Sequence, residues 1–423
     1  MNPPVQDAIV ACARDSYSQL LSFVASRAGG DISSAEDALG EAFLSALRTW
    51  PEEGVPSRPE AWLLTAAKRR LIDLQRREDT RIRMEGTLVH AMELAQEAVE
   101  EGHDLHDERL KLLFICAHPA IDVSSRTPLM LQTVLGMNAE CIASAFLAAP
   151  AAMGQRLVRA KAKIRAARIP FQVPSPEEWP ERLTFVLDAI YVAFNVGFGT
   201  TGTEDTGNVG FAKEAIYLAR ILLQMAPKEP EAFGLLSLML FVHSRERARR
   251  TPDGVFVPLN RQDSLQWSVP MIQEAETLLR EASSFGRPGR FQIEAAIQSV
   301  HAQRAITGRT NWFMIEGFYR ILGVFTEAVG ARIGHAVAIA QVRGPKDGLA
   351  ELDAIPEPLV ADHQPYWVAR GHLLRCNGDS ALSRRAYQRA VGLTEDPAVR
   401  DFLLLEMTSE DQGPRSEDSA SEE

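Results

Sequence analysis

The side chains of this sequence that could do chemistry are two runs of lysine and arginine. Residues 155–168 hold six basic side chains and no acidic one, and residues 68–83 hold seven basic and three acidic ones. Both runs lie in an acidic chain of 423 residues whose formal net charge is −11. Positive charge concentrated on short segments of an acidic protein indicates contact with a polyanion such as nucleic acid. The alternative for each run is a solvated helix face.

Signatures of catalysis and of metal binding are missing from the sequence. It has no GxSxG, HExxH or GxxxxGK[ST] motif, and no GxGxxG motif after a strand. The four cysteines are single, without a CxxC pair: Cys12, Cys116, Cys141 and Cys376. We therefore expect no enzyme activity, no metal site and no cofactor.

The hydrophobic pattern predicts an all-α protein. Apolar residues recur at helical spacing through almost every long segment, and alternating runs rich in Val, Ile and Thr are missing. A hydrophobic share of 46% and a charged share of 24% are typical of a soluble protein. No run approaches 18 apolar residues and the N-terminus does not resemble a secretory signal, so we expect a cytoplasmic protein without a membrane span.

Proline-rich and acidic segments divide the chain. Four prolines fall between residues 170 and 180, and residues 91–108 hold seven acidic side chains and no lysine or arginine. The segment after Met407 lacks apolar anchors, which predicts disorder. The expected parts are a small helical domain at residues 1–90, a linker at 91–106, a second small helical domain at 107–170, a large helical domain at 180–406 and a tail at 407–423.

The first basic run lies on a predicted helix that begins near Pro59. Its apolar stripe is Leu63, Ala67, Leu71 and Leu74, and Lys68, Arg69 and Arg76 fall on another side. The preceding helix, at 33–50, has Ser34 as a candidate N-cap. Its apolar side holds Ala35, Leu39, Phe43, Ala46 and Leu47, and its other side holds Glu36, Asp37 and Glu41. These carboxylates either bind a basic partner or favour the helix N-terminus through its dipole.

The second basic run ends a predicted set of four short helices between residues 107 and 168. Asn138 is the expected N-cap of the third helix, and Ala148 to Pro150 make a tight turn into the fourth. A short helix, a turn and a longer basic helix are the parts of a helix-turn-helix, whose second helix enters the DNA major groove. The alternative is an ordinary αα-hairpin.

The C-terminal half shows signals of tetratricopeptide-like repeats. One repeat falls on Trp367, Gly371, Leu374, Ser383, Tyr387 and Ala390. Weaker matches include Ala215, Ala219, Leu222 and Pro227, then Phe233, Leu236 and Leu240, and also Ala336, Ile339 and Leu352 around Gly344. Such repeats present a concave surface, which predicts a protein or peptide partner, or else they form a purely structural cap.

Taken together, these segments resemble a bacterial RNA polymerase sigma factor of the extracytoplasmic-function (ECF, sigma-70-like) class. The motifs are SAEDALGEAFLSALRTW, VPSRPEAWLLTAAKRRLIDLQRRE, DERLKLLFICAHPAI and SAFLAAPAAMGQRLVRAKAKIRAARIPF. HPA and QRLVRAKAKIR are similar to a subgroup with a C-terminal tetratricopeptide-repeat-like domain. The segments AIYLARILLQMAPKEPEAFGLLSLMLF, FQIEAAIQSVHA and GHLLRCNGDSALSRRAYQRAVGL share that character. The resemblance runs from about residue 15 to residue 405.

The resemblance implies partners and roles for particular residues. The partners are core RNA polymerase and promoter DNA. It implies polymerase binding by Glu36, Asp37, Glu41 and Arg48. It implies minus-ten binding and strand opening by Trp62, Lys68, Arg69, Arg70, Arg76 and Arg77. It implies minus-thirty-five recognition by Ala151, Ala152, Gln155, Arg156, Arg159 and Lys163. The acidic segment at 91–108 would be a linker through the polymerase channel.

Several positions depart from that subgroup. Gly40 replaces a usual glutamine in the polymerase-binding helix, and a glycine there costs about 1 kcal/mol relative to alanine. Ala149, Ala151 and Ala152 replace more polar residues at the start of the reading helix, and the runs VPLNRQDSLQW and GARIGHAVA also differ. The leading hypothesis is a sigma factor regulated by its own C-terminal domain. The alternative is a helical-repeat adaptor whose sigma-like half is degenerate.

Overall fold

The structure is a computed structural model that describes residues 3–79, 105–146, 148–175, 177–199 and 210–408. Its regular elements in this part of the chain are helices, and the one β-bridge is isolated, between Arg250 and Phe256. The all-α expectation is confirmed for these residues. The expected linker at 91–106, apart from its last two residues, and the tail after Thr408 lie outside them.

Two compact units make up the chain. The first comprises residues 1–197 and 210–225, and the second comprises residues 198–209 and 226–423. The first unit contains α1 (Pro3–Asp15), α2 (Tyr17–Arg27), α3 (Ile32–Glu53), α4 (Pro59–Asp79), α6 (Leu105–Cys116), α7 (Val123–Thr133), α8 (Ala139–Ala145), α9 (Pro150–Ala167), α10 (Trp179–Gly199, which ends just beyond it) and α11 (Phe211–Met225).

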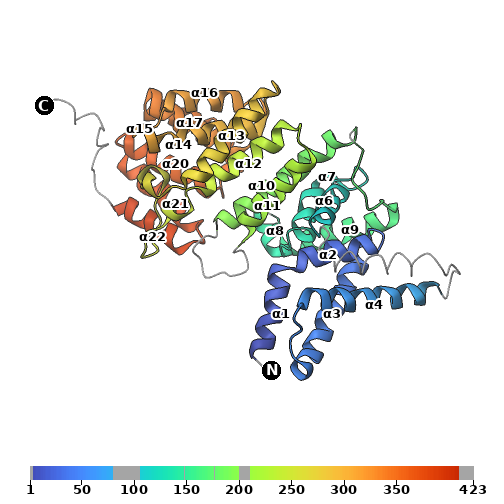
Figure 1. Cartoon of the computed structure of the whole chain (residues 1–423). Helices are drawn as coiled ribbons and strands as arrows, with labels where there is room; N and C mark the ends of the chain where they lie inside the picture. The colour runs from blue at the N-terminus through green and yellow to red at the C-terminus, as the bar shows by residue number, and fades with distance from the viewer. Residues whose placement is uncertain (1–2, 80–104, 147, 176, 200–209, 409–423) are drawn as a thin grey trace. The chain divides into compact units, whose positions relative to one another are not determined.

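The first four helices share one apolar core, in which α3 and α4 lie side by side (Figure 1). The predicted stripe of α3 is confirmed, because Ala35, Leu39 and Ala46 are fully buried. Leu63, Ala67 and Leu71 of α4 are buried in the same core, and the burial of Leu74 is not described. The indole of Trp50 packs edge-on against that of Trp62, with ring centroids 5.5 Å apart.

The N-cap of α3 is Asp31, so the prediction of Ser34 is wrong. The carboxylate of Asp31 accepts a hydrogen bond from the backbone N–H of Ser34 at 3.2 Å. Ser34 instead donates its hydroxyl to Asp31 at 2.7 Å. The aspartate carboxylate accepts from a backbone N–H that has no partner within the helix, as a serine hydroxyl at the cap would. Its negative charge also complements the helix dipole.

The helices α10 and α11 group with the first unit, and not with the domain expected from residue 180 onward. Arg109 of α6 is fully buried and forms an ion pair with Glu214 of α11. Phe114 of α6 packs against Trp179 of α10 with ring centroids 5.0 Å apart. A buried arginine needs its carboxylate, and this pairing therefore links α11 to α6.

By length and composition, α10 is apolar enough to cross a membrane, with a mean hydropathy of 1.2 in its most apolar window. Half of that window is buried inside the protein, and Val186, Ile190 and Phe194 are fully buried. A core helix has the same composition, so this feature is weak evidence for a span.

The second unit is built from packed helical hairpins, shown from yellow to red in Figure 1. Its helices are α12 (Pro230–His243), α13 (Val269–Ser284), α14 (Arg290–Ala302), α15 (Arg304–Thr307), α16 (Trp312–Leu322), α17 (Val329–Arg343), α18 (Pro345–Asp353), α19 (Glu357–Val360), α20 (Gln364–Cys376), α21 (Ser380–Gly392) and α22 (Pro397–Thr408), with 3₁₀ turns η1 (Glu246–Arg249), η2 (Leu259–Arg261) and η3 (Ser264–Gln266). The central helix α12 packs on both α13 and α14 and is buried along most of its length.

The hairpin predicted from Trp367 to Ala390 is present as α20 and α21. The hydroxyl of Ser383 donates to the carbonyl of Gly371 at 2.8 Å, and the buried ring of Tyr387 lies against Gly371. A second hairpin forms from α17 and α18, where Ala336, Ile339 and Leu352 are buried as expected. These contacts establish helical hairpins. Whether they are tetratricopeptide repeats remains a proposal.

Candidate nucleic-acid interface

The candidate interface centres on α9 and the short helix before it. Asn138 caps α8 as predicted, accepting a hydrogen bond from the backbone N–H of Cys141 at 2.7 Å. Between α8 and α9 the helix axes turn by 109°. Pro150 is the first residue of α9. The backbone N–H that proline lacks would have no partner within the helix at this position, so no helical hydrogen bond is lost. A short helix, a turn and a longer helix are therefore present as the sequence predicted.

The amphipathic pattern of α9 decides which of its side chains reach solvent. Its buried positions are Met153, Leu157, Ala160 and Ile164, one on each turn. The predicted base-reading residues Ala151, Ala152 and Gln155 are exposed, and so are Arg159 and Lys163, whereas Arg156 is half-buried. All six residues predicted for this surface thus lie on α9 outside its packed stripe.

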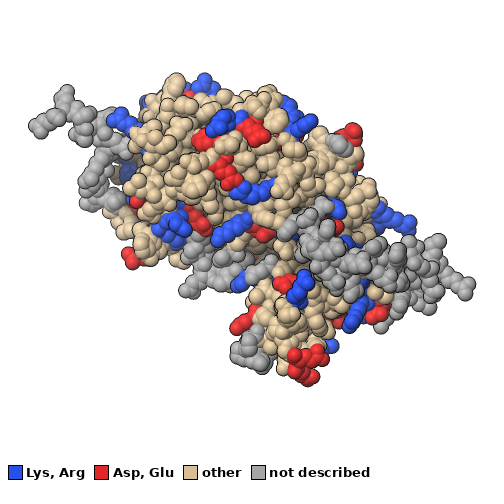
Figure 2. Space-filling model, in the orientation of Figure 1, with Lys and Arg blue, Asp and Glu red and all other residues tan. Residues whose placement is uncertain are grey.

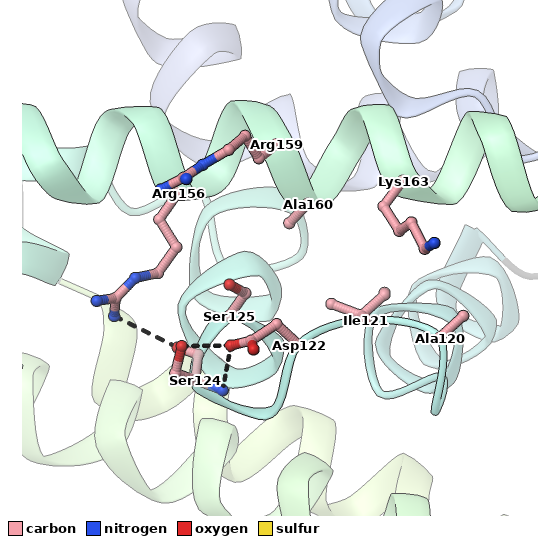
Figure 3. Close-up of a pocket in the computed structure, with 9 residues that line it drawn as sticks. All are labelled: Ala120, Ile121, Asp122, Ser124, Ser125, Arg156, Arg159, Ala160 and Lys163. Carbon is pink, nitrogen blue, oxygen red and sulfur yellow. Dashed lines mark hydrogen bonds between the residues drawn. The ribbon is translucent and has the colours of Figure 1, made fainter.

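A depression of about 490 Å³ lies between α9 and the start of α7 (Figure 3). Its polar lining comes from Asp122, Ser124 and Ser125 on one side and from Arg156, Arg159 and Lys163 on the other. Figure 3 shows Arg156 reaching across to the first turn of α7, where its guanidinium donates to the carbonyl of Ser124 at 3.5 Å. Three cations beside two hydroxyls form a surface suited to phosphate groups.

One carboxylate opposes these cations. Asp122 caps α7 by accepting from the backbone N–H of Ser124 at 3.0 Å. Hydrogen bonds from the hydroxyl and backbone N–H of Ser124 lower the pKa of Asp122, and Arg156 and Arg126 add to the effect. The carboxylate is therefore charged at neutral pH. Its hydrogen bonds to Ser124 leave Arg159 and Lys163 available to a ligand.

Two further cations of α9 turn away from this surface toward α3. Lys161 donates to both carboxylate oxygens of Glu36, at 2.9 and 2.7 Å. Arg165 donates to Asp31 at 2.7 Å and to the hydroxyl of Ser34 at 3.3 Å. The basic run at 155–168 has no acidic residue of its own, but two of its six positive charges, Lys161 and Arg165, are paired with carboxylates at the start of α3.

The Lys161–Glu36 pair is largely shielded from solvent, whereas the Arg165 side chain of the second pair is exposed. The side chain of Lys161 is 11% exposed and that of Glu36 is 25% exposed. Partial burial raises the pKa of Asp31, but hydrogen bonds from Ser34 and Arg165 outweigh it and leave the pKa below its usual value. Sequence reasoning missed Asp31, Lys161 and Arg165 as an interacting set, because no local pattern connects residues so far apart in the chain.

The carboxylates predicted to bind polymerase divide into two groups. Asp37 and Glu41 are exposed, as is Arg48 two turns further along α3. Glu36 is not free in this arrangement, because Lys161 holds it. At its end α3 carries two further exposed carboxylates, Glu52 and Glu53. Figure 2 shows where acidic side chains gather on this face of the molecule. The exposed acidic face of α3 therefore begins at Asp37.

The residues predicted for strand opening have different surroundings. Arg69 is exposed, whereas Lys68 and Arg70 are half-buried. Arg76 and Arg77 lie in the C-terminal part of α4, and their side chains are outside the described residues. Trp62 is half-buried and makes an edge-type contact with Trp50, so part of its indole belongs to the core and part is open to solvent.

No group of three or more potential metal ligands occurs within the described residues. Burial raises the pKa of Cys116 to about 12, and its thiol lies 3.5 Å from the hydroxyl of Thr133. A thiol with such a high pKa is protonated and unreactive at neutral pH.

Parts of this chain match known protein families. Residues 14–81 match Sigma-70 region 2, and residues 182–283 match a family of unknown function, DUF6596. The Uncharacterized protein R00370 of Rhizobium meliloti (strain 1021) is 36% identical over 377 residues, which cover 88% of this chain and 89% of that protein. This chain belongs to the same family as R00370. No solved structure matches this chain.

The sigma-70 region 2 match covers all of α2, α3 and α4, and Asp37, Glu41 and Arg69 lie on the last two of these helices. The domain supports a role in transcription initiation for this member of the R00370 family. The DUF6596 match begins in α10 and ends in α13, so it spans parts of both compact units.

Proposed function

We propose that this protein is a sigma factor, which binds core RNA polymerase and directs promoter-specific transcription initiation. The observation that carries the proposal is the sigma-70 region 2 match on α2 to α4, followed in the same chain by α9 with its exposed basic face. A sigma factor catalyses no covalent step. Its place of action is the cytoplasm, where RNA polymerase works.

In this proposal α3 binds polymerase through Asp37 and Glu41. Both carboxylates are exposed on one face of the helix, and Arg48 is exposed on the same helix. A basic surface of the polymerase would pair with them. Gly40 lies between them with nothing within 4 Å of a hypothetical Cβ, so its missing side chain leaves open space beside the acidic pair.

In this proposal α8 and α9 form a helix-turn-helix that reads the minus-thirty-five element. Ala151, Ala152 and Gln155 lie at the exposed start of α9, the part of a recognition helix that meets base edges. Arg156, Arg159 and Lys163 would contact phosphates on the rim of the depression beside α7. Alanine offers a methyl group to thymine but no hydrogen bond, so Gln155 would supply the polar base contact.

Minus-ten binding is assigned to α4. Arg69 is exposed and Lys68 and Arg70 are half-buried on its middle turns, and Arg76 and Arg77 follow on its last turns. Cations spaced along one helix suit the backbone of a displaced strand. The half-buried indole of Trp62, near the start of the same helix, would supply an aromatic surface for a base.

The contact between α3 and α9 constrains how such a factor works. The two promoter elements are about 25 base pairs apart, or about 85 Å at 3.4 Å per base pair. Lys161 and Glu36 lie within hydrogen-bond distance, so α9 cannot read the upstream element in this arrangement while region 2 occupies the downstream one. The Lys161–Glu36 and Arg165–Asp31 pairs therefore break when the factor engages a promoter.

The second unit would act as a tetratricopeptide-like regulatory domain that binds a protein or peptide. Its hairpins α17/α18 and α20/α21 support this assignment. A second candidate function is favoured by the three exposed alanines at the start of α9, namely a helical-repeat adaptor with a degenerate sigma-like half. Such an adaptor would bind its partner without binding polymerase.

Transcription in vitro tests the proposal. Purified protein and core RNA polymerase are combined on a library of fragments from the host genome, and transcript starts are mapped. Starts that require the protein and share two upstream sequence elements support a sigma factor. Absence of any protein-dependent start, together with a partner captured without polymerase in a pull-down, would favour the adaptor.

A further inference from the structure

The second unit contains a buried arginine whose surroundings differ from those of the other buried arginines. Among the described residues, Arg109 pairs with Glu214, Arg126 with Glu181 and Arg182 with Glu178. Arg245, two residues after α12 and directly before η1, is 8% exposed, and no described carboxylate lies within ion-pair distance of it. Buried charges are normally paired, because an unpaired buried charge is strongly destabilising.

Within the part of the chain that the structure describes, the guanidinium of Arg245 has one hydrogen-bond partner, which is neutral. Its guanidinium donates to the side-chain oxygen of Gln298 on α14 at 2.7 Å. The same guanidinium lies 6.0 Å from the ring centre of Trp267. The amide and the indole face offset part of the desolvation, but neither carries a negative charge.

The groups nearest Arg245 add positive charge. Arg304 places its guanidinium 5.0 Å from the ring centre of the same Trp267 and donates to the backbone carbonyl of Gln262 at 2.7 Å. Burial lowers the pKa of Arg245 to about 10, with Arg249 and Arg304 contributing, so Arg245 remains charged at neutral pH. Burial also lowers the pKa of His301, to about 4, and the positive charges of Arg245 and Arg304 contribute. His301 is therefore neutral at neutral pH.

The cluster also holds a buried donor without a partner. Trp267 is 3% exposed, and its indole N–H makes no hydrogen bond. Like the guanidinium of Arg245, this N–H requires an acceptor oxygen. Arg304, Gln298 and His301 are half-buried, so this edge of the cluster meets solvent, and the indole N–H lies beneath it.

We propose that Arg245, Arg304 and Trp267 form a binding site for a small oxyanion, a free phosphate or carboxylate compound. Guanidinium groups bind such oxygens through paired N–H donors, and the orphan indole N–H would supply a further donor. The site joins the end of α12, the segment before α13 and α15, and the first two are already linked by the backbone bond from Ser268 to Ser244 at 2.9 Å. Ligand binding would therefore stiffen the second unit, independently of the sigma-factor proposal.

The test measures anion binding by the full-length protein. Thermal unfolding and calorimetric titration are run with inorganic phosphate, with succinate and with chloride at the same ionic strength. We expect saturable stabilisation by phosphate or by succinate but not by chloride, and Arg245→Met should weaken that binding by at least about tenfold. A response to phosphate alone assigns a phosphate ligand, and a response to succinate alone assigns a carboxylate.

The matched control is Arg247→Met, which removes the same charge from an exposed position two residues away. Arg247→Met should bind the anion as wild type does. Both arginine variants leave α9 unchanged, so phosphate bound at α9 would contribute equally to each protein. Trp267→Phe keeps the ring and removes the N–H, and it should weaken binding if Arg245→Met does not fold. Equal responses to phosphate, succinate and chloride in wild type, Arg245→Met and Trp267→Phe would overturn the proposal. Arg245 would then be held by Gln298 and Trp267 alone.

Discussion

Lys161 on α9 donates to both carboxylate oxygens of Glu36 on α3, although 125 residues separate them in the chain. Arg165, one turn further along α9, makes the equivalent contact with Asp31 just before α3. Two charged pairs thus join the helix proposed to read the promoter to the helix proposed to bind polymerase. Polymerase binding and DNA binding would be coupled through the same residues.

Removing the carboxylate of Glu36 should loosen α9. We expect Glu36→Gln to lower the free energy of unfolding by about 1 kcal/mol, because the pair is largely shielded but not fully buried. The same variant should bind a minus-thirty-five duplex more tightly than wild type in the absence of polymerase. Urea unfolding and fluorescence anisotropy measure the two effects.

The exchange of charges provides the control for that experiment. The double variant Glu36→Lys/Lys161→Glu should recover part of the stability that the single variants Glu36→Lys and Lys161→Glu lose. Asp37→Asn changes an exposed position one residue along and should leave stability and duplex binding unchanged. A double variant that is less stable than either single variant would show that the two side chains do not interact.

The Asp31 contact predicts a dependence of stability on pH. The pKa of Asp31 is lowered below its usual 3.8 in the folded protein, so its contribution is fully present above that value. It is lost as the pH falls through the lowered folded-state pKa. The stability difference between wild type and Asp31→Asn, measured by urea unfolding from pH 7 downward, should therefore shrink in acid. A difference that grows in acid would contradict the assignment.

Phosphate contacts by α9 predict a change in salt dependence. Arg156→Ala and Arg159→Ala should each weaken duplex binding and reduce the slope of log K against log salt by about 0.9 per lost contact. The control Arg280→Ala removes an exposed charge from α13 in the second unit and should leave the slope unchanged. An unchanged slope in the α9 variants would mean that this face does not meet DNA.

The packing of the second unit predicts opposite effects at two helical glycines. A Cβ on Gly234 of α12 would lie 2.7 Å from the backbone nitrogen of Gln292, whereas a Cβ on Gly317 of α16 would have nothing within 4 Å. Gly234→Ala should destabilise the protein by about 1–3 kcal/mol through overpacking. Gly317→Ala should stabilise it by about 0.5–1 kcal/mol through the gain in helix propensity. Chemical unfolding that reverses this order would contradict the packing of α12 on α14.

Periodicity predicted much of the local structure from the sequence. Ala35, Leu39 and Ala46 are buried as expected because a helix of known phase has one apolar side, and Asn138 caps α8 because its side chain can reach only the N–H groups that follow it. The choice between Asp31 and Ser34 as cap failed because both residue types satisfy the same donor.

Long-range pairing was not predictable in the same way. The pairs Lys161–Glu36 and Arg109–Glu214 depend on how helices pack, and the spacing of residues in the sequence does not predict which helices pack together. α11 groups with the first unit, where Glu214 pairs with Arg109, and the pattern around residue 180 does not reveal that contact. The anion-binding cluster was likewise invisible, since Arg245, Trp267 and Arg304 come from three separate segments.

The most direct test of the account is co-purification with core RNA polymerase. Wild type is compared with Asp37→Lys/Glu41→Lys, which reverses the exposed acidic pair of α3, and with Glu52→Lys/Glu53→Lys, a matched reversal at the end of the same helix. We predict a stable complex for wild type and for the Glu52/Glu53 variant, and none for the Asp37/Glu41 variant. Failure of wild type to bind polymerase at all would contradict the proposed function.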